Sequence, residues 1–271
     1  MPSYKNTDLE ILIATMNRSD LSFLESMFQQ PLADVKASIL VVNQTDANAA
    51  ISDWEHIKVM NVNQFGLSKS RNLAIDNSNK DLCWILDDDC IVMPDAIKHI
   101  INAHNSVPNS IITFQTEVIE NGQPYWDYPL KEQTHNSRSL RSVLSPEITF
   151  KRALVGEKLR FDERFGLGAQ FQDSENFVFL KEGICQGSAP YFVNKTIVKH
   201  KALNSSEEVT SDRLIYARGA LAAYLKRNIT FMKWKYGFFL FRKGLAASFF
   251  ELKHKTKTFQ DGAQDYFKSS N

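Results

Sequence analysis

Three consecutive carboxylates stand in the stretch WILDDDC, residues 84–90, directly after an apolar run. Carboxylates crowded at one place repel one another, and they persist where a hard divalent cation or a set of hydroxyl donors neutralises them. With the spacing D-x-D, Asp87 and Asp89 flank Asp88, so that one outer carboxylate can hold a metal and the other a hydroxyl group. An acidic turn that only caps a following helix is the alternative.

The bulk composition gives no other reason for this cluster. The 271 residues include 32 basic and 31 acidic side chains, a balance that describes a soluble protein without a nucleic-acid-binding charge. Three cysteines, an odd number far from zinc-finger spacing, favour a reducing compartment and a cytoplasmic location. The first residues, MPSYKNTDLEIL, have no apolar stretch of signal-peptide length, and no segment offers a run of about 18 apolar residues that would span a membrane.

Short apolar runs alternate with helical patterns through the first half of the chain, which predicts βαβ units, an α/β fold and a mainly parallel sheet. The predicted strands cover residues 9–15, 37–43, 57–62, 82–87 and 111–116, and the predicted helices cover residues 20–29, 66–76 and 94–105. The three aspartates therefore end the fourth strand. Ligands of open α/β sheets bind beyond the carboxyl ends of the strands, so these side chains are expected to face a crevice.

The pattern changes after residue 116, where the loop ENGQPYWDYP begins a less regular region with one helix predicted near residues 175–186. The last sixty residues read as two helices, about 207–226 and 231–254. Residues 1–206 are predicted to form one domain, with halves of about 1–116 and 117–206, and residues 207–271 a helical extension. The aromatic and basic stretch KWKYGFFLFRKGLAASFF predicts either an interfacial helix or a helix packed on the domain.

The block FGLSKSRNLAIDNSNKDLCWILDDDC, residues 65–90, resembles the centre of family 2 glycosyltransferases, in which a G-L-S-x-x-R-N helix precedes a strand that ends in D-x-D. The stretch ATMNR resembles the P-T-Y-N-R of that family, with Ala14 and Met16 departing from it. Residues 161–180 resemble its F-D-E-x-F-G-x-G block with the acidic helix start that follows. The resemblance covers residues 9–206 and implies the GT-A fold, with a central sheet, flanking helices and a helical C-terminal appendage.

The resemblance also implies roles for individual residues. Asp87 would lie near the ribose of a nucleotide and Asp89 on a divalent metal, Mn²⁺ or Mg²⁺, with His200 as a further metal ligand. Glu175 aligns with the catalytic base, and Asp173 remains its rival because the acidic helix start reads S-E-N. The other residues expected on the donor side are Thr15, Asn17, Arg18, Asn43, Gln44, Arg71, Asn72 and Asp88.

These expectations describe an inverting, metal-dependent transferase of the polysaccharide type. It would move a sugar from a nucleotide-sugar, with UDP as the favoured nucleotide, to a glycan or lipid-linked acceptor. It would work in the cytoplasm at the inner face of the membrane, with peripheral contact through the C-terminal helix. The alternatives are a non-catalytic nucleotide-sugar or glycan-binding protein and a phosphohydrolase of the haloacid-dehalogenase type, whose D-x-D usually ends the first strand instead of the fourth.

Overall fold

The computed structural model describes residues 3–47, 49–155, 159–202 and 210–269. The chain divides into two compact units, one of Met1–Asp162 with Asn176–Ala202 and one of Glu163–Glu175 with Leu203–Asn271. The segment Glu163–Glu175 thus groups with the C-terminal helices, although the sequence pattern predicts it within residues 1–206. The domain boundary predicted between residues 206 and 207 lies outside the described residues.

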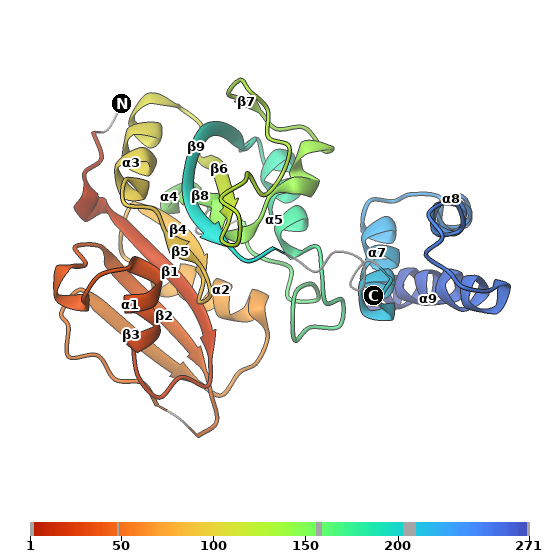
Figure 1. Cartoon of the computed structure of the whole chain (residues 1–271), viewed down its shortest axis with the longest axis horizontal. Helices are drawn as coiled ribbons and strands as arrows, with labels where there is room; N and C mark the ends of the chain where they lie inside the picture. Colours follow the sequence, from red (N-terminus) through yellow and green to blue (C-terminus); the bar gives the residue numbers. More distant parts are fainter. Residues whose placement is uncertain (1–2, 48, 156–158, 203–209, 270–271) are drawn as a thin grey trace. The chain divides into compact units, whose positions relative to one another are not determined.

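The first unit is built on a mixed sheet. Among the described residues its strands are β1 (Leu9–Met16), β2 (Ser38–Gln44), β3 (Ile57–Val62), β4 (Leu82–Asp87), β5 (Ile91–Val92), β6 (Ile111–Val118), β7 (Gln133–Thr134), β8 (Ile148–Lys151) and β9 (Tyr191–His200). The order is β3-β2-β1-β4-β8-β6-β9-β5, and β7 pairs with β9. The first four strands of this order are parallel neighbours, while β8 is antiparallel to both β4 and β6. Figure 1 shows the parallel strands β1, β2 and β3 side by side.

The predicted α/β fold is confirmed, and each predicted strand and helix of the first half ends within two residues of the observed one. The helices of this unit are α1 (Ser22–Phe28), α2 (Leu67–Asn77), α3 (Ala96–Ser106), α4 (Arg152–Val155) and α5 (Glu175–Cys185). Apolar runs of six to eight residues with Val and Ile form strands buried on both faces, as parallel strands connected by helices require.

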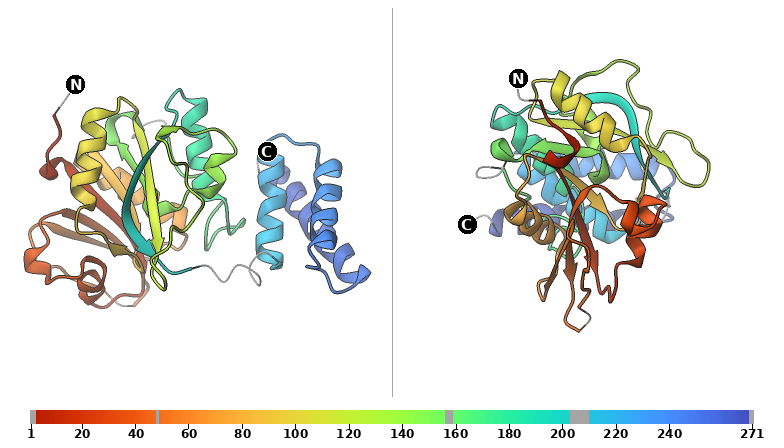
Figure 2. Two further views of the ribbon diagram at one scale, coloured as in Figure 1. Left: turned by 45° about the horizontal axis from the view of Figure 1, so that its top comes forward. Right: turned by 90° about the vertical axis from the view of Figure 1, so that its left-hand side faces the viewer.

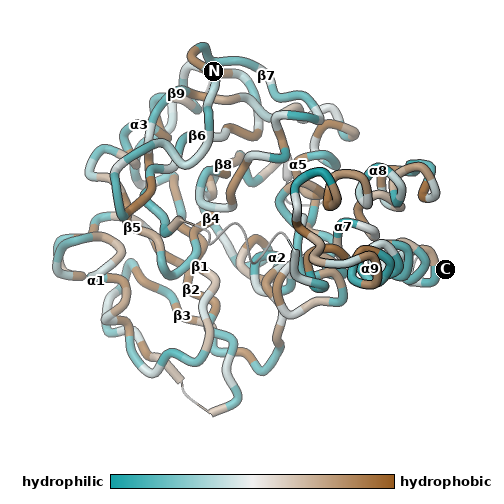
Figure 3. Tube along the Cα trace, turned by 45° about the vertical axis from the view of Figure 1, so that its right-hand side comes forward, coloured by the Kyte–Doolittle hydropathy of each residue, from teal (hydrophilic) through white to brown (hydrophobic). Residues whose placement is uncertain are grey.

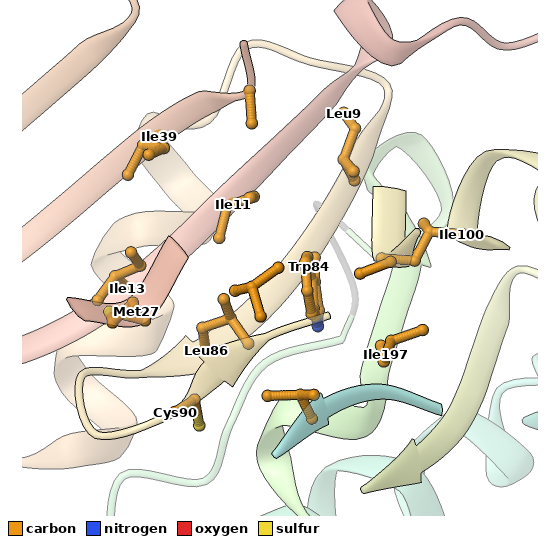
Figure 4. Packing of buried hydrophobic residues seen from close by; sticks show 14 of the residues in the cluster. Leu9, Ile11, Ile13, Met27, Ile39, Trp84, Leu86, Cys90, Ile100 and Ile197 are labelled. Atoms are coloured by element: carbon orange, nitrogen blue, oxygen red, sulfur yellow. The ribbon is translucent and has the colours of Figure 1, made fainter. Parts of the chain in front are cut away.

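The core of the first unit lies between the sheet and the helices α1 and α3. Figure 4 shows Trp84 from β4 among side chains of β1, α3 and β9, including Ile11, Ile100 and Ile197. Trp84 is fully buried, and its indole Nε1 donates to the carbonyl of Pro146 at 2.8 Å. The burial of β4 on both faces holds the strand in one register, and this fixes where the aspartates emerge.

The described residues of the second unit form three long helices, coloured blue in Figure 2: α7 (Asp212–Tyr224), α8 (Ile229–Arg242) and α9 (Phe249–Lys268). The single helix predicted over residues 231–254 is wrong, because α8 ends at Arg242 and the chain turns at Gly244, whose φ is +63°. Glycine adopts this conformation at little cost, so the turn is favoured there. The predicted helix over 207–226 corresponds to α7, and its expected first residues lie outside the described part of the chain.

Helices α7 and α9 cross at two glycines. A Cβ added at Gly219 would lie 1.9 Å from the carbonyl oxygen of Phe259, and one added at Gly262 would lie 2.0 Å from that of Tyr216. The segment Glu163–Glu175 packs in the same unit through rings: Phe171 lies 5.5 Å from Tyr216 and 6.1 Å from Tyr266 between ring centroids. The FGLGAQF block, residues 165–171, therefore belongs to an aromatic core with these helices.

Candidate active site

The carboxyl ends of β1, β2 and β4 bring most of the predicted donor residues to one edge of the sheet. In the register of the parallel strands, Ala14 on β1 is level with Asp87 on β4, and Met16 is level with Gln44 on β2. Residues that follow these strands therefore emerge beside one another, although they are up to 73 positions apart in the chain. Such an edge is where open α/β sheets bind their ligands.

The three aspartates after β4 have three different partners. Asp87 accepts a hydrogen bond from Arg71 Nη2 at 2.8 Å and another from the hydroxyl of Ser145 at 2.6 Å, one on each carboxylate oxygen. The Arg71 side chain is only 3 % exposed, whereas Asp87 is 25 % exposed. A charge as deeply buried as Arg71 needs a paired charge, and Asp87 supplies it. The pair therefore places a buried cation against a partly exposed carboxylate at the end of β4.

Asp88 is paired with the residues that end β1. Its Oδ2 accepts from Arg18 Nη2 at 2.7 Å and from the Thr15 hydroxyl at 2.5 Å. The Arg18 side chain is 41 % exposed, so one face of this pair is open to solvent. A depression of ≈ 760 Å³ lies beside the pair and is also lined by residues of α1 and its flanks, among them Phe23 and Ser26. The middle aspartate thus ties the end of β4 to the end of β1.

Asp89 lies against His200, the last residue of β9, with Nε2 to Oδ1 at 3.3 Å. Burial alone would lower the pKa of His200, but the hydrogen bond and the charge of Asp89 outweigh it and raise the pKa to about 9. The same hydrogen bond from His200 lowers the pKa of Asp89. The other ring nitrogen, Nδ1, donates to the carbonyl of Lys201 at 2.8 Å, and this directs Nε2 toward Asp89.

Within the described residues, Asp89 and His200 meet the simplest requirement for a cation site. Their ligand atoms and the thiol of Cys90 all lie within 4.8 Å of one another. A carboxylate with an imidazole suits a divalent transition metal, and an imidazole whose second N–H is held by a carbonyl is oriented as metal-binding histidines usually are. Cys90 is 1 % exposed, and burial raises the pKa of its thiol well above the ordinary value, which disfavours the thiolate that a metal would need.

The amides at the end of β2 hold the neighbouring loops. Asn43 is fully buried; its Oδ1 accepts from the Arg18 backbone N–H at 3.0 Å, and its Nδ2 donates to the Arg18 carbonyl at 2.8 Å. Gln44 Oε1 accepts from the backbone N–H of Gly66, which precedes α2, at 2.7 Å. Asn17 directly follows β1 in the left-handed region at φ +54°, and its backbone N–H donates to the Gln44 carbonyl at 3.0 Å. Direct contact of Asn43 or Gln44 with a base stays a prediction.

Helix α2 contributes two neighbouring residues with different partners. Arg71 reaches Asp87 and also donates from Nη1 to the side-chain oxygen of Asn176 at 3.2 Å. Asn72 is 8 % exposed and makes a reciprocal pair with the backbone of Phe161, donating to its carbonyl at 3.0 Å and accepting from its N–H at 2.9 Å. Asn72 therefore holds the segment that leads into the FGLGA block.

The two candidate bases lie at the start of α5, and both belong to the second unit. Glu175 is the first residue of α5, one position before Asn176, whose side chain accepts from Arg71. Asp173 accepts a hydrogen bond from the Ser174 hydroxyl at 2.7 Å, and Ser174 itself has a φ of +72°, an unfavourable value for serine. Strained backbone of this kind is concentrated at functional segments.

Sequence reasoning missed Ser145 and Glu147. Ser145 is 5 % exposed and donates to Asp87, and Glu147 is 1 % exposed and accepts from the Tyr128 hydroxyl. Burial raises the pKa of Glu147 to about 8, against the opposing effect of the Tyr128 hydrogen bond. Both residues lie in or beside the short 3-10 helix Ser145–Glu147, and no local pattern in SPEITF predicts that it reaches β4.

Comparison with known proteins bears on the family and the fold. Residues 11–167 match the family described as "Glycosyl transferase family 2". A Haemophilus influenzae protein described as an uncharacterized glycosyltransferase is 22 % identical over 199 residues, which cover 70 % of this chain and 66 % of that protein. The chain thus spans slightly less than two thirds of that relative.

Solved structures with a similar fold include S. aureus TarS 1-349, with a TM-score of 0.52 and 13 % sequence identity over 80 % of this chain and 65 % of TarS 1-349. TarS 1-349 in complex with UDP gives a TM-score of 0.53 with 13 % identity over 78 % of this chain and 64 % of that one. TarS 1-349 in complex with UDP-GlcNAc gives a TM-score of 0.52 with 12 % identity over 80 % of this chain and 66 % of that one. At this identity the likeness concerns the fold, which corresponds to the GT-A type that the sequence resembles.

Proposed function

Since the chain belongs to glycosyl transferase family 2, whose model matches residues 11–167, we propose that it is a sugar-transferring enzyme. It would transfer a sugar from a nucleotide-sugar to an acceptor hydroxyl. The observation that carries the proposal is the edge of the sheet after β1, β2 and β4. There two carboxylates that are two positions apart in the chain each form a pair, Asp87 with Arg71 and Asp89 with His200 from the end of β9. One offers groups for a ribose and a phosphate, and the other offers ligands for a cation.

The proposed donor is a UDP-sugar. TarS, which shares the fold, has been solved with UDP and with UDP-GlcNAc, and this supports a nucleotide-sugar as the donor class here. Thr15, Asn17 and Arg18 are proposed to line the nucleoside site from the end of β1. Asp87 would accept the ribose hydroxyls, while the guanidinium of Arg71 is suited to the diphosphate because it is always charged and forks onto two oxygens.

The proposed cofactor is Mn²⁺ or Mg²⁺, held by Asp89 and His200. The donor types fit once the Nε2 proton that His200 shares with Asp89 at 3.3 Å is released, because one carboxylate and one oriented imidazole then remain. When bound, the metal would supply positive charge where the diphosphate departs. The chain's own contribution is to keep Nε2 of His200 directed at Asp89 through the Nδ1 hydrogen bond to Lys201.

The proposed reaction is a single displacement that inverts the anomeric carbon. The acceptor oxygen forms a bond to that carbon while the bond to the diphosphate oxygen breaks and its electron pair leaves with the diphosphate. Glu175 takes the proton of the acceptor hydroxyl as general base. Asp173 stays the rival candidate, because it lies two positions before Glu175, where it accepts a hydrogen bond from the Ser174 hydroxyl at 2.7 Å.

The acceptor is proposed to be a glycan or a lipid-linked saccharide, which would place the protein in the cytoplasm at the inner face of the membrane. The haloacid-dehalogenase alternative is disfavoured, since the aspartates follow β4, with β1, β2 and β3 before it in the chain. A non-catalytic binding protein differs from the proposal in one measurable way, because it would bind the nucleotide-sugar and leave it intact.

The test of donor and metal is calorimetric titration of UDP with Mn²⁺ and with EDTA. We expect binding only with the cation, and we expect Asp89→Asn to abolish the difference between the two conditions and to remove most of the affinity. Asp53→Asn removes an exposed carboxylate elsewhere in the first unit and serves as the control. Equal affinity for UDP in Mn²⁺ and in EDTA would refute the metal site.

The test of the base is transfer from a UDP-sugar to a surrogate acceptor by Glu175→Gln and Asp173→Asn. We expect Glu175→Gln to lower the turnover rate by about 10² to 10⁴ and to leave UDP affinity within a few-fold. Asp173→Asn should lower the turnover rate by a smaller factor than Glu175→Gln. Loss of a helix-capping role would cost only about 1 kcal/mol, as stability instead of rate, so a melting curve of each variant separates the two roles. A dead Asp173→Asn with an active Glu175→Gln would reverse the assignment.

A further inference from the structure

Helix α8 carries a stripe of exposed aromatic side chains. Phe231, Trp234, Phe238 and Phe241 are 65 %, 73 %, 63 % and 71 % exposed. Their spacings of three, four and three residues place them along one face of the helix. Single exposed apolar side chains are common on proteins, but a contiguous row of large ones marks an interaction surface. We call these four residues the aromatic stripe.

The opposite face of α8 packs on α9, and this fixes the direction of the stripe. Tyr236 stacks on Phe259 with ring centroids 5.4 Å apart, and Leu240 is fully buried. A Cβ added at Gly237 would lie 2.9 Å from the Thr256 side chain, so the two helices are close at this point. The stripe faces away from α9, and Figure 3 shows hydrophobic and hydrophilic residues interspersed along both helices.

The exposed aromatic surface continues into the start of α9. Phe249 and Phe250, its first two residues, are 76 % and 83 % exposed. The turn through Gly244 connects them directly to the end of α8 at Arg242. A pair of adjacent exposed phenylalanines at a helix start is costly in water, and it adds to the apolar surface of the second unit.

The charges around the stripe have one sign. Residues 229–250 contain four basic side chains and no aspartate or glutamate. Lys235, Arg242 and Lys243 are exposed, and Lys233 donates to Gln260 on α9 at 2.8 Å. Aromatic side chains with lysine and arginine beside them are the composition of helices that lie in the headgroup region of anionic bilayers.

The geometry favours lying on a bilayer over crossing it. Helix α8 has 14 residues, which corresponds to a length of about 21 Å, shorter than the hydrocarbon core of about 30 Å. Across the described residues, none of the helices combines the length and the apolar character that a membrane span requires. A second copy of this chain is the less favoured occupant, because a two-fold contact would bring Lys235, Arg242 and Lys243 against their own copies.

We propose that the aromatic stripe of α8, together with Phe249 and Phe250, docks the second unit on the surface of an anionic lipid bilayer. Trp234 would enter the interface, and Lys235, Arg242 and Lys243 would contact lipid phosphates. This binding activity goes beyond sugar transfer and rests on none of the donor-site residues. It would hold the protein where a lipid-linked substrate is concentrated.

The experiment is flotation of the full chain with vesicles of phosphatidylcholine alone or mixed with phosphatidylglycerol. We expect binding to the anionic vesicles at low salt, weaker binding at high salt and little binding to neutral vesicles. Phe238→Ala with Phe241→Ala should lower the partition coefficient at least about tenfold. Leu130→Ala, which removes a 93 % exposed side chain from the first unit, should leave it unchanged.

A charge variant tests the electrostatic half of the proposal. Lys235→Glu with Lys243→Glu should lower the partition coefficient at least about tenfold. Lys36→Glu with Lys98→Glu changes the net charge equally on exposed positions of the first unit and should have a much smaller effect. Equal losses in the two double variants would mean that only net charge matters, and that result would overturn the assignment to α8.

Fluorescence reports on the site itself. The chain has four tryptophans, so the vesicle-induced blue shift of wild type is compared with that of Trp234→Phe. We expect the shift to disappear in the variant. The proposal is overturned if wild type does not float with anionic vesicles, if the shift survives in Trp234→Phe, or if neutral vesicles bind equally well. It is also overturned if sedimentation shows a dimer that the Phe238→Ala and Phe241→Ala changes dissociate while vesicles are not bound.

Discussion

Replacing Arg71 with methionine would remove the cation at the centre of the candidate site while keeping much of its volume. Arg71 is 3 % exposed and bridges two helices and a strand, since it donates to Asp87 at 2.8 Å and to Asn176 at 3.2 Å. Its guanidinium also lies 5.4 Å from the ring centroid of Phe161. Methionine can fill the space but supplies no donor to Asp87.

The size of the effect follows from the burial of the two partners. Removing one partner of a fully buried ion pair costs about 3 to 5 kcal/mol. Asp87 keeps 25 % exposure and the hydrogen bond from Ser145, so we expect the lower end, about 3 kcal/mol of unfolding free energy. Arg71→Lys keeps the charge, but one ammonium cannot reproduce the planar fork that contacts Asp87 and Asn176. We therefore expect its unfolding free energy to lie between those of wild type and Arg71→Met.

Arg160→Met is the matched control for this substitution. Arg160 pairs with Asp76 at 2.5 Å, but the two side chains are 32 % and 52 % exposed. A pair of this kind contributes about 0 to 1 kcal/mol because water screens it. The assay is urea unfolding followed by circular dichroism, with the tryptophan signal as a second probe of the first unit. If Arg71→Met and Arg160→Met cost the same, burial of the Arg71–Asp87 pair does not determine its contribution and the reasoning fails.

Three further predictions concern stability. Burial raises the pKa of Glu147 from 4.5 to about 8, so between these pH values the folded state keeps a proton that the unfolded state releases. The free energy of unfolding should therefore fall by about 1.4 kcal/mol per pH unit as pH rises from 4.5 to about 8. Glu147→Gln should remove this slope in urea titrations at several pH values, and parallel curves for variant and wild type would contradict it. Gly219→Ala should lower the unfolding free energy of the second unit by about 1 to 3 kcal/mol or more, because the added methyl would lie 1.9 Å from the Phe259 carbonyl oxygen. A loss below about 1 kcal/mol in thermal unfolding would mean that α7 and α9 shift apart at little cost. Asn72→Asp should lower the free energy of unfolding by about 1 to 3 kcal/mol, since the carboxylate would face the Phe161 carbonyl, and UDP affinity should stay within a few-fold. A large loss of UDP affinity at unchanged stability would instead give Asn72 a direct role in donor binding.

The first half of the fold could be predicted because its signals are local. Strands such as Leu9–Met16 and Leu82–Asp87 are apolar runs bounded by polar residues, and α2 begins after Gly66. The second half was predicted less well for a physical reason. The turn at Gly244 interrupts a stretch whose aromatic and basic composition is continuous, so periodicity alone joined α8 to the start of α9.

The sequence by itself determined which side chains stand at the ends of β1, β2 and β4, because the alternation of strands and helices requires these ends to share one edge of the sheet. It therefore indicated Asp87, Asp88 and Asp89 as site residues. It did not determine their partners. Nothing in the spacing shows that Asp88 belongs to Arg18 or that Asp87 is shared by Arg71 and Ser145.

Only the tertiary structure decided how the charges are distributed, since each of these partners comes from a different element that approaches β4 through packing. Asn43 and Asn72 illustrate the same point. The Asn43 amide hydrogen-bonds to the backbone of Arg18, 25 positions away, and the Asn72 amide to the backbone of Phe161, 89 positions away. Backbone polar groups buried by folding must find partners, and which side chain supplies them depends on contacts that form only when distant segments meet.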